Sequence, residues 1–205
     1  NEAEGIKNAG DIYNCEKCKN KGIIAFNYNE NFMTKSCECL KIRKVIKDLN
    51  KSGIGAADKN TFENYIISES WQKDILNKAK AFLNEPTGTK WFFIGGQVGA
   101  GKTHIGKAIA YEFIKQGVFV QYMKWQKEVQ ILNAFANDAE YLERINKFIL
   151  PKVLYIDDFL KTSSGTNPTQ GEIKRATDII YQRYNQQNSV IIISSEKSIN
   201  EIMDC

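Results

Sequence analysis

The sequence predicts an α/β fold in three layers, with a parallel β-sheet between two layers of helices. The first observation is that apolar runs typical of buried strands alternate with amphipathic helical patterns from residue 67 onward. The second is a run that ends in a glycine-rich loop followed by a helix, and the third is a run that ends in two aspartates. Such loops and carboxylates are expected at the carboxyl edge of the sheet, where open α/β folds bind their ligands.

The expected elements alternate along the chain. Helices are predicted at 70–83, 103–116, 125–148 and 171–185, and strands at 91–94, 118–123, 153–156 and 190–194. The strands are continuous apolar runs, as in parallel sheets that are covered by helices on both faces. A polar turn rich in Ser, Thr and Gly is predicted at 161–170 and is expected to lie near a nucleotide.

The loop after the first of these strands follows the pattern G-x-x-x-x-G-K-[ST], with Gly96, Gly101, Lys102 and Thr103 at its fixed positions. Glycines let successive backbone N–H groups turn toward a phosphate, and the N-terminus of the next helix favours an anion. Lys102 is predicted to neutralise the β- and γ-phosphates and Thr103 to bind Mg²⁺. A chance glycine-rich turn is the alternative, which the flanking strand and helix disfavour.

The nucleotide-binding segment is therefore predicted to comprise Gly96, Gln97, Val98, Gly99, Ala100, Gly101, Lys102, Thr103 and His104. We interpret the imidazole of His104 as a packing group that has no chemical role.

The run Val153–Asp158 is predicted to supply the acidic partner of this loop. Asp157 is the candidate ligand of Mg²⁺ and Asp158 the candidate general base that polarises the attacking water. By itself the run would often be a strand that leads into a loop. Together with the phosphate-binding loop it predicts a site for ATP and Mg²⁺.

The last apolar run, at 190–194, is followed by Ser195 and Glu196. If this strand lies beside the acidic strand, either residue would lie near the γ-phosphate and could sense it. A strand that simply ends in a serine-rich turn is the alternative interpretation.

Composition limits the class of protein. The chain has 205 residues, of which 42% are hydrophobic and 25% charged, and its formal net charge is +4. It contains no signal peptide and no apolar run of membrane-spanning length. We expect a cytoplasmic protein without a membrane partner, and we expect the protein to continue beyond Cys205, because the chain stops a few residues after a strand.

Four cysteines in the N-terminal part form two close pairs, Cys15 with Cys18 and Cys37 with Cys39. This pattern predicts a structural Zn²⁺ site with four thiolate ligands. Two disulfides or a redox Cys-x-x-Cys are the alternatives, disfavoured by the ATPase-like remainder of the chain and by the second pair. The span 22–32 between the pairs is predicted to form a β-hairpin, and so small a module would need the metal to fold.

Three segments are predicted: a zinc-binding module at 1–45, a linker at 46–60 and an ATPase domain at 61–205. A helical pattern at 40–49 carries lysines on one face. These lysines could be solvated or could contact nucleic-acid phosphates. The glycine-rich residues 51–57 are expected to act as a hinge between the modules. Phe62 and Tyr65 are candidates for the adenine pocket or for the core.

Together these motifs resemble the DnaC/DnaI type of AAA+ ATPase, the replicative helicase loaders, with the transposition ATPase IstB as a close relative. The resemblance rests on residues 95–104, Tyr-Ile-Asp-Asp-Phe159, Tyr-Gln-Arg-Tyr184 and Ile-Ile-Ser-Ser-Glu196, and on 51–54 with Thr-Phe-Glu-Asn-Tyr65. It covers nearly the whole chain. The cysteine module resembles the loaders' helicase-binding domain, which IstB-type proteins typically lack.

The resemblance implies an ATPase that forms a homo-oligomer with ATP, binds the hexameric replicative helicase through its N-terminal module and delivers it to single-stranded DNA. It implies Lys102, Asp157, Asp158 and Glu196 as catalytic residues, with Glu196 as first sensor where the family usually has Asn or Asp. An arginine finger and a second sensor are expected beyond Cys205, so we expect weak hydrolysis from residues 1–205 by themselves.

The resemblance also implies DNA contact through the helices after the second strand. Tyr122 and Trp125 could stack on bases there, or could belong to the core. Two other functions remain open: a transposition or DNA-remodelling ATPase that binds duplex DNA, and a nucleotide-gated adaptor with negligible hydrolysis.

Overall fold

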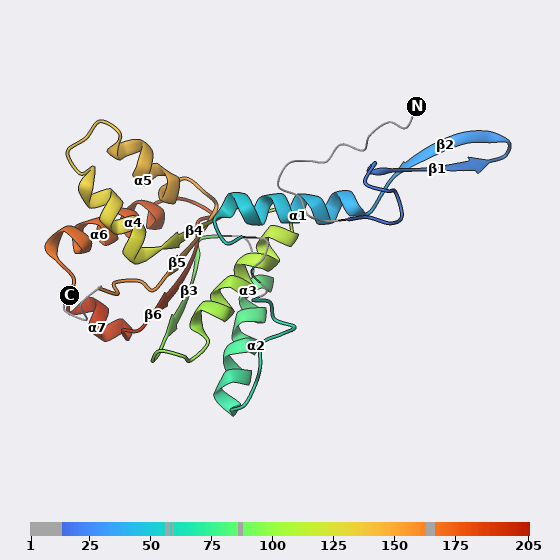
Figure 1. The fold of residues 1–205 in the computed structure, drawn as a ribbon. Helices are drawn as coiled ribbons and strands as arrows, with labels where there is room; N and C mark the ends of the chain where they lie inside the picture. The colour runs from blue at the N-terminus through green and yellow to red at the C-terminus, as the bar shows by residue number, and fades with distance from the viewer. Residues whose placement is uncertain (1–13, 56–57, 59, 86–87, 163–166) are drawn as a thin grey trace.

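A four-stranded parallel sheet forms the centre of the C-terminal part of the chain (Figure 1). The computed structural model describes residues 14–55, 58, 60–85, 88–162 and 167–205. The strands are β3 (Lys90–Gly95), β4 (Val120–Lys124), β5 (Val153–Asp157) and β6 (Val190–Ser195). Their spatial order is β3-β6-β5-β4. The last strand in the sequence, β6, therefore lies between β3, which precedes the phosphate-binding loop, and β5, which ends at the acidic pair.

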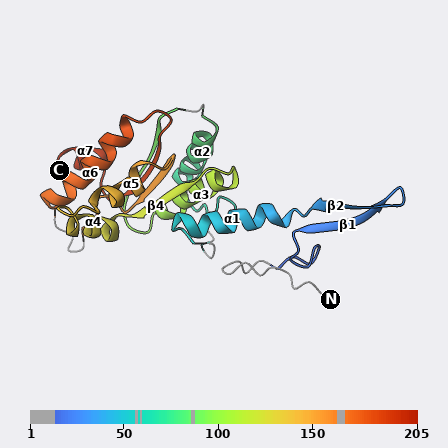
Figure 2. The same ribbon diagram turned by 90° about the horizontal axis from the view of Figure 1, so that it is seen from above.

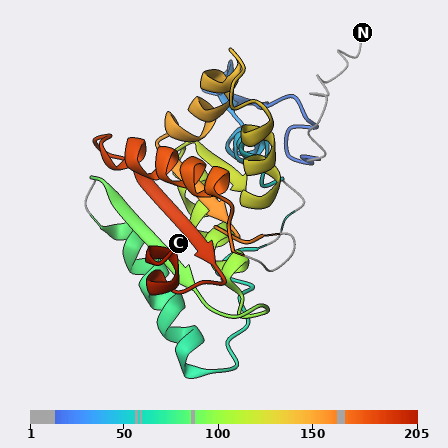
Figure 3. The same cartoon turned by 90° about the vertical axis from the view of Figure 1, so that its left-hand side faces the viewer.

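Helices cover both faces of this sheet (Figure 3). On one face lie α2 (Ser70–Asn84) and α3 (Lys102–Lys115). On the other lie α4 (Trp125–Ala134), α5 (Tyr141–Ile149) and α6 (Gln170–Tyr184). Alternate residues of β5 enter the two cores, Val153 and Tyr155 on one side and Leu154 and Ile156 on the other, as the period of a strand requires. This confirms the predicted three-layer α/β fold.

The N-terminal part is a hairpin of β1 (Ile23–Tyr28) and β2 (Asn31–Ser36), joined to the sheet domain by α1 (Cys39–Ser52). The strands pair antiparallel from Ile23 with Ser36 to Tyr28 with Asn31. Asn29 and Glu30 both have positive φ, as a two-residue hairpin turn of type I′ requires. Figure 2 shows the hairpin extending away from the sheet domain at the far end of α1.

The helix α1 crosses the predicted boundary between residues 45 and 46 without a break. Its C-terminal half packs on the sheet domain, where Leu49 is buried and Val45 is partly buried in the core beside α3. The glycine-rich residues after it begin with Gly53, whose φ of 89° ends the helix. The expected hinge therefore follows a helix that is already packed on the sheet domain, because the apolar face of α1 buries itself there.

Within the described residues the elements match the predicted order, with three differences. The predicted helix 125–148 is two helices, α4 and α5, separated by residues 135–140. The strand predicted from 118 begins at Val120, because Gly117 and Val118 close the turn after α3. A short helix, α7 (Ile199–Met203), follows β6 and was not predicted. None of the helices in the described part combines the length and apolar character needed to span a bilayer.

One charged side chain, Arg183 of α6, is completely buried. Its guanidinium donates to five backbone carbonyl oxygens at distances of 2.7–3.2 Å, those of Phe148, Ile149, Pro151, Lys152 and Val190. These carbonyls lie at the end of α5, in the turn after it and at the start of β6. Arg183 therefore joins α6 to the end of α5 and to the start of β6. Burial lowers the pKa of its guanidinium to about 10.

Candidate nucleotide and metal sites

The phosphate-binding loop has the backbone that its glycines predict. Gly96, Gly99 and Gly101 all have positive φ, at 153°, 81° and 81°. Positive φ turns successive N–H groups to one side of the loop, which is the arrangement that receives phosphate oxygens. A Cβ on Gly101 would lie 3.1 Å from the ring of Tyr65, so this position is also closely packed. The chemistry and shape of the loop fit the phosphates of a nucleotide.

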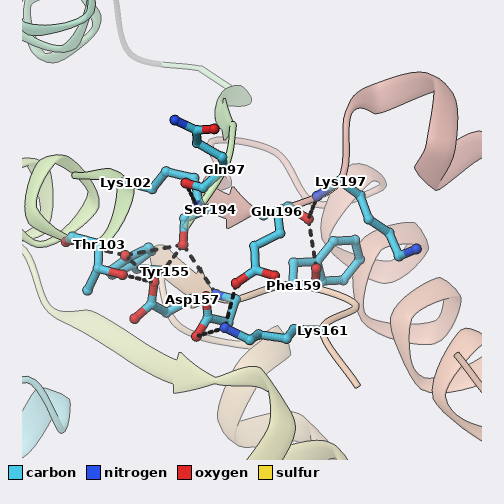
Figure 4. A network of polar contacts seen from close by, with 12 residues as sticks. Gln97, Lys102, Thr103, Tyr155, Asp157, Phe159, Lys161, Ser194, Glu196 and Lys197 are labelled. Carbon is cyan, nitrogen blue, oxygen red and sulfur yellow. Dashed lines mark hydrogen bonds and ion pairs between the residues drawn. The ribbon is translucent and has the colours of Figure 1, made fainter. Parts of the chain in front are cut away.

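Lys102 and Thr103 begin α3 at the end of this loop. The ammonium of Lys102 is largely buried and donates to the Gln97 carbonyl oxygen at 2.8 Å. The hydroxyl of Thr103 donates to Asp157 Oδ1 at 2.9 Å. The structure therefore brings together the loop and the first aspartate of the predicted acidic pair, 54 residues apart (Figure 4).

The carboxylate of Asp157 accepts four hydroxyl groups. Oδ1 accepts from Thr103 at 2.9 Å, Tyr155 at 2.7 Å and Ser194 at 2.6 Å, and Oδ2 accepts from Tyr122 at 2.8 Å. Burial by itself would raise the pKa of Asp157, but these four bonds outweigh it and hold that pKa below its usual value. Asp157 is therefore held ionised and oriented, as a carboxylate that binds Mg²⁺ must be.

The second aspartate, Asp158, lies in a strained turn. Asp158 and Leu160 have φ of 57° each, which is uncommon for residues other than glycine. The buried side chains of Phe159 and Leu160 fix the turn, and two bonds tie it to β6: Phe159 N–H to the Ser194 carbonyl at 2.8 Å and Ser195 hydroxyl to the Phe159 carbonyl at 2.8 Å. The direction of the Asp158 side chain is set by this turn.

Ser194 joins the two aspartates and was not among the predicted residues. Its fully buried hydroxyl donates to Asp157 and accepts the backbone N–H of Asp158 at 3.2 Å. Its neighbours Ser195 and Glu196 are the sensor candidates that the sequence indicates. The alternation of side chains along β6 would have identified Ser194, if the strand order had been known.

Glu196, the predicted sensor, is exposed and forms an ion pair with Lys161 at 2.5 Å. Lys161 Nζ also lies 3.8 Å from Asp158 Oδ2. The hydrogen bond that Lys161 donates to Glu196 raises the pKa of Lys161, with a further contribution from the Asp158 charge. The Lys161 ammonium is thus within ion-pair distance of both the candidate base and the candidate sensor, and Figure 4 shows its contact with Glu196.

The helix α3 also contacts Asp58, Thr61 and Tyr65 of the segment that precedes α2. His104 Nε2 donates to the Thr61 carbonyl oxygen at 2.8 Å, and its ring meets the edge of Tyr65 with centroids 5.1 Å apart. One turn on, Lys107 forms an ion pair with Asp58. The imidazole of His104 is engaged in packing, as predicted. Of the two adenine-pocket candidates, Phe62 lies in the core and Tyr65 lies against the loop.

The two aromatic residues proposed for DNA contact have other roles. Trp125 is fully buried and packs against Phe159 with ring centroids 4.9 Å apart. Tyr122 is partly buried, with its hydroxyl on Asp157. For Trp125 the structure therefore favours the core alternative over stacking on a base, because a fully buried indole has no face free for a base.

The four N-terminal cysteines converge as predicted. Their sulfurs all lie within 4.8 Å of one another, with Cys15 and Cys37 Sγ 3.8 Å apart and Cys18 and Cys39 Sγ 3.5 Å apart. A tetrahedral Zn²⁺ with Zn–S bonds of about 2.3 Å requires sulfurs roughly 3.8 Å apart. The Gly22 N–H also points to Cys18 Sγ at 3.3 Å, a bond that favours a thiolate. The donor set fits a structural zinc site.

We expect the purified protein to contain about one zinc per chain, because four buried thiols converge with the ligand number and spacing of a structural zinc site. Cys37→Ser should remove most of this zinc and reduce the β-signal of the hairpin in circular dichroism. Cys205→Ser, at an exposed thiol outside the cluster, is the matched control and should retain the metal. Elemental analysis measures the content, and full zinc in Cys37→Ser would contradict the assignment.

This chain is similar in sequence to a known protein family and to a protein of Bacillus subtilis. The model of the family described as IstB-like ATP binding protein matches residues 42–204. The uncharacterized protein YqaM of Bacillus subtilis is 29% identical over 182 residues, which cover 83% of this chain and 57% of YqaM. The chain therefore spans little more than half the length of this relative.

Two solved structures share the fold. The crystal structure of the DnaC helicase loader aligns with a TM-score of 0.59 at 19% identity, covering 71% of this chain and 82% of that one. The crystal structure of DnaI aligns with a TM-score of 0.61 at 17% identity, covering 71% and 77%. At these identities the likeness establishes a common α/β fold.

Proposed function

The chain belongs to the family of IstB-like ATP-binding proteins, and from this premise we propose that it is an ATP-dependent loader of the replicative DNA helicase onto single-stranded DNA. In this proposal the sheet domain binds and hydrolyses ATP, assembles into a homo-oligomer with ATP and contacts single-stranded DNA. The hairpin module contacts the hexameric helicase.

The observation that carries the proposal is the direct attachment of the cysteine cluster to the nucleotide-binding domain. Cys39 is the first residue of α1 and a member of the cluster, and Leu49 of the same helix lies in the core beside α3, the helix that carries Lys102 and Thr103. The hairpin beyond the cluster exposes apolar side chains to solvent, among them Tyr28, Phe32 and Met33. Exposed apolar groups on a hairpin that is anchored at such a cysteine cluster are suited to bind another protein.

The residues at the carboxyl edge of the sheet would divide the work on ATP. Loop N–H groups and Lys102 would hold the phosphates, and Thr103 and Asp157 would hold Mg²⁺, which when bound neutralises the charge that develops on the transferred phosphate. Asp158 would orient and deprotonate the attacking water, and Glu196 would contact the γ-phosphate region through its position beside Asp158.

The test is co-elution on a sizing column of the protein with the replicative helicase of the same organism, with and without ATP. We expect a complex that the double variant Cys15→Ser, Cys18→Ser abolishes and that Cys205→Ser leaves intact. In a separate assay of helicase delivery to single-stranded DNA, Lys102→Ala should retain the complex but lose delivery. Absence of a complex under every nucleotide condition would refute the loader function.

A second candidate is an IstB-like transposition or DNA-remodelling ATPase, which the matched family model itself favours. It predicts tight binding of duplex DNA in the presence of ATP and no contact with a helicase. Fluorescence anisotropy with duplex and single-stranded oligonucleotides of equal length distinguishes the two functions, since a loader should prefer the single strand.

A further inference from the structure

The carboxylate that would hold Mg²⁺ is bonded by two tyrosines that the phosphate-binding motifs do not include. Tyr155 lies two residues before Asp157 on β5, and its hydroxyl donates to Asp157 Oδ1 at 2.7 Å. Tyr122 lies on the neighbouring strand β4 and donates to Oδ2 at 2.8 Å. The two tyrosines are paired in the register of β4 and β5, and their ring centroids are 5.3 Å apart. Each oxygen of the Asp157 carboxylate thus accepts a hydrogen bond from one of the two tyrosines.

Both tyrosine side chains are fixed by their surroundings. Tyr155 is completely buried, and its ring lies so close to Gly106 of α3 that a Cβ there would overlap it. Tyr122 is partly buried in the same core, with the Lys107 ammonium 5.4 Å from its ring centroid. Each phenol is the donor in its bond, because the Asp157 carboxylate can only accept. They therefore hold Asp157 in one orientation.

The donors are neutral, which matters for a cation site. Asp158 and Glu196 share the Lys161 ammonium, whereas the hydroxyl groups on Asp157 carry no charge. An ammonium on Asp157 would compete with Mg²⁺ for the carboxylate, but a hydroxyl orients the carboxylate and leaves its negative charge in place. The distribution of bonds is also uneven. Oδ1 accepts three hydroxyls and Oδ2 accepts one, so Oδ2 has the lone pair for a further ligand.

We propose that Tyr122 and Tyr155 are positioning residues for magnesium: they fix the Asp157 carboxylate so that Oδ2 faces the cation or one of its water ligands. This inference rests on the proposed ATP site. It adds to that site two residues from the sheet interior that act through Asp157 and touch neither the nucleotide nor the metal.

The test compares ATP affinity with and without Mg²⁺ for Tyr155→Phe and Tyr122→Phe, each of which removes only the hydroxyl. In excess Mg²⁺ we expect the Kd for ATP to rise roughly tenfold, the effect of losing a bond to a charged group. The Mg²⁺ concentration for half-maximal hydrolysis should rise as well. In excess EDTA the Kd of each variant should equal that of the unchanged protein, because the loop and Lys102 bind the phosphates without Asp157.

Tyr141→Phe is the matched control. Its hydroxyl also donates to a carboxylate, that of Asp178, at 3.4 Å. This bond lies between α5 and α6, on the face of the sheet opposite α3. This variant should show the Kd of the unchanged protein under both conditions. Thermal unfolding of the metal-free variants measures any structural loss separately.

The outcomes separate this inference from the ATP site itself. Equal weakening with Mg²⁺ and with EDTA would show a general structural effect and overturn the positioning role, as would no change under either condition. If the unchanged protein binds ATP under neither condition, the proposed ATP site fails as well.

Discussion

Replacing Arg183 with methionine is expected to destabilise the sheet domain by about 3–5 kcal/mol, enough to unfold much of the protein near 37 °C. Methionine fills a similar volume but donates no hydrogen bond. Five backbone carbonyls at the end of α5 and the start of β6 would lose a donor inside the protein. Each buried carbonyl left without a donor costs about 1–3 kcal/mol, partly offset because the desolvated charge is also removed.

Urea unfolding followed by circular dichroism measures this change. Lys174→Met on the same helix also removes one positive charge, but from an exposed position, and should change stability by less than about 0.5 kcal/mol. Equal midpoints for the two variants would contradict the role assigned to Arg183. Arg183→Lys should recover only part of the loss, because one ammonium cannot reach five carbonyls that a planar guanidinium spans.

Gly106→Ala should both destabilise the protein and impair its use of ATP. In the interior of an ordinary helix this change stabilises by roughly 1 kcal/mol. Here the new methyl group would overlap the Tyr155 ring, which is completely buried and has no free volume to enter. Relief requires α3 or Tyr155 to shift, at a cost of about 1–3 kcal/mol or more. Either shift moves Tyr155 or Thr103 away from Asp157.

Unfolding midpoints and Mg²⁺-dependent ATP hydrolysis measure the two effects. Gly171→Ala in the first turn of α6 is the comparison, since its methyl group would lie 3.2 Å from the Asn133 side-chain amide and would overlap no ring or backbone. We expect Gly171→Ala to retain activity and Gly106→Ala to lose at least about tenfold. A stabilised and fully active Gly106→Ala would show that the helix accommodates the methyl group.

The sequence was sufficient for the features that depend on local spacing. The phosphate-binding loop, the two aspartates after an apolar run and the two cysteine pairs each form a pattern within a few residues. The sequence predicted only that strands and helices alternate, whereas the position of β6 between β3 and β5 came from the structure.

The site residues that the sequence did not predict are those whose contacts depend on which strands are neighbours in the sheet. Ser194, Tyr155 and Tyr122 meet at Asp157 from three adjacent strands, and nothing in the spacing of these residues indicates their common target. The choice between core and base contact for Trp125 stayed open for a related reason, because helical periodicity does not show what covers a face of the helix. The helix α7 did have a local signal: Ser198 and Glu201 form a capping box at its start.

The path of α1 gives the molecule a mechanical property. Fourteen residues at 1.5 Å each make a rod about 21 Å long, one end of which holds Cys39 of the metal cluster while the other is buried beside α3. A rotation of this rod by about 10° around its buried end would displace the cluster by about 4 Å. Small movements of the buried end of α1 near the nucleotide site would therefore cause larger displacements of the hairpin, with no change inside the hairpin itself.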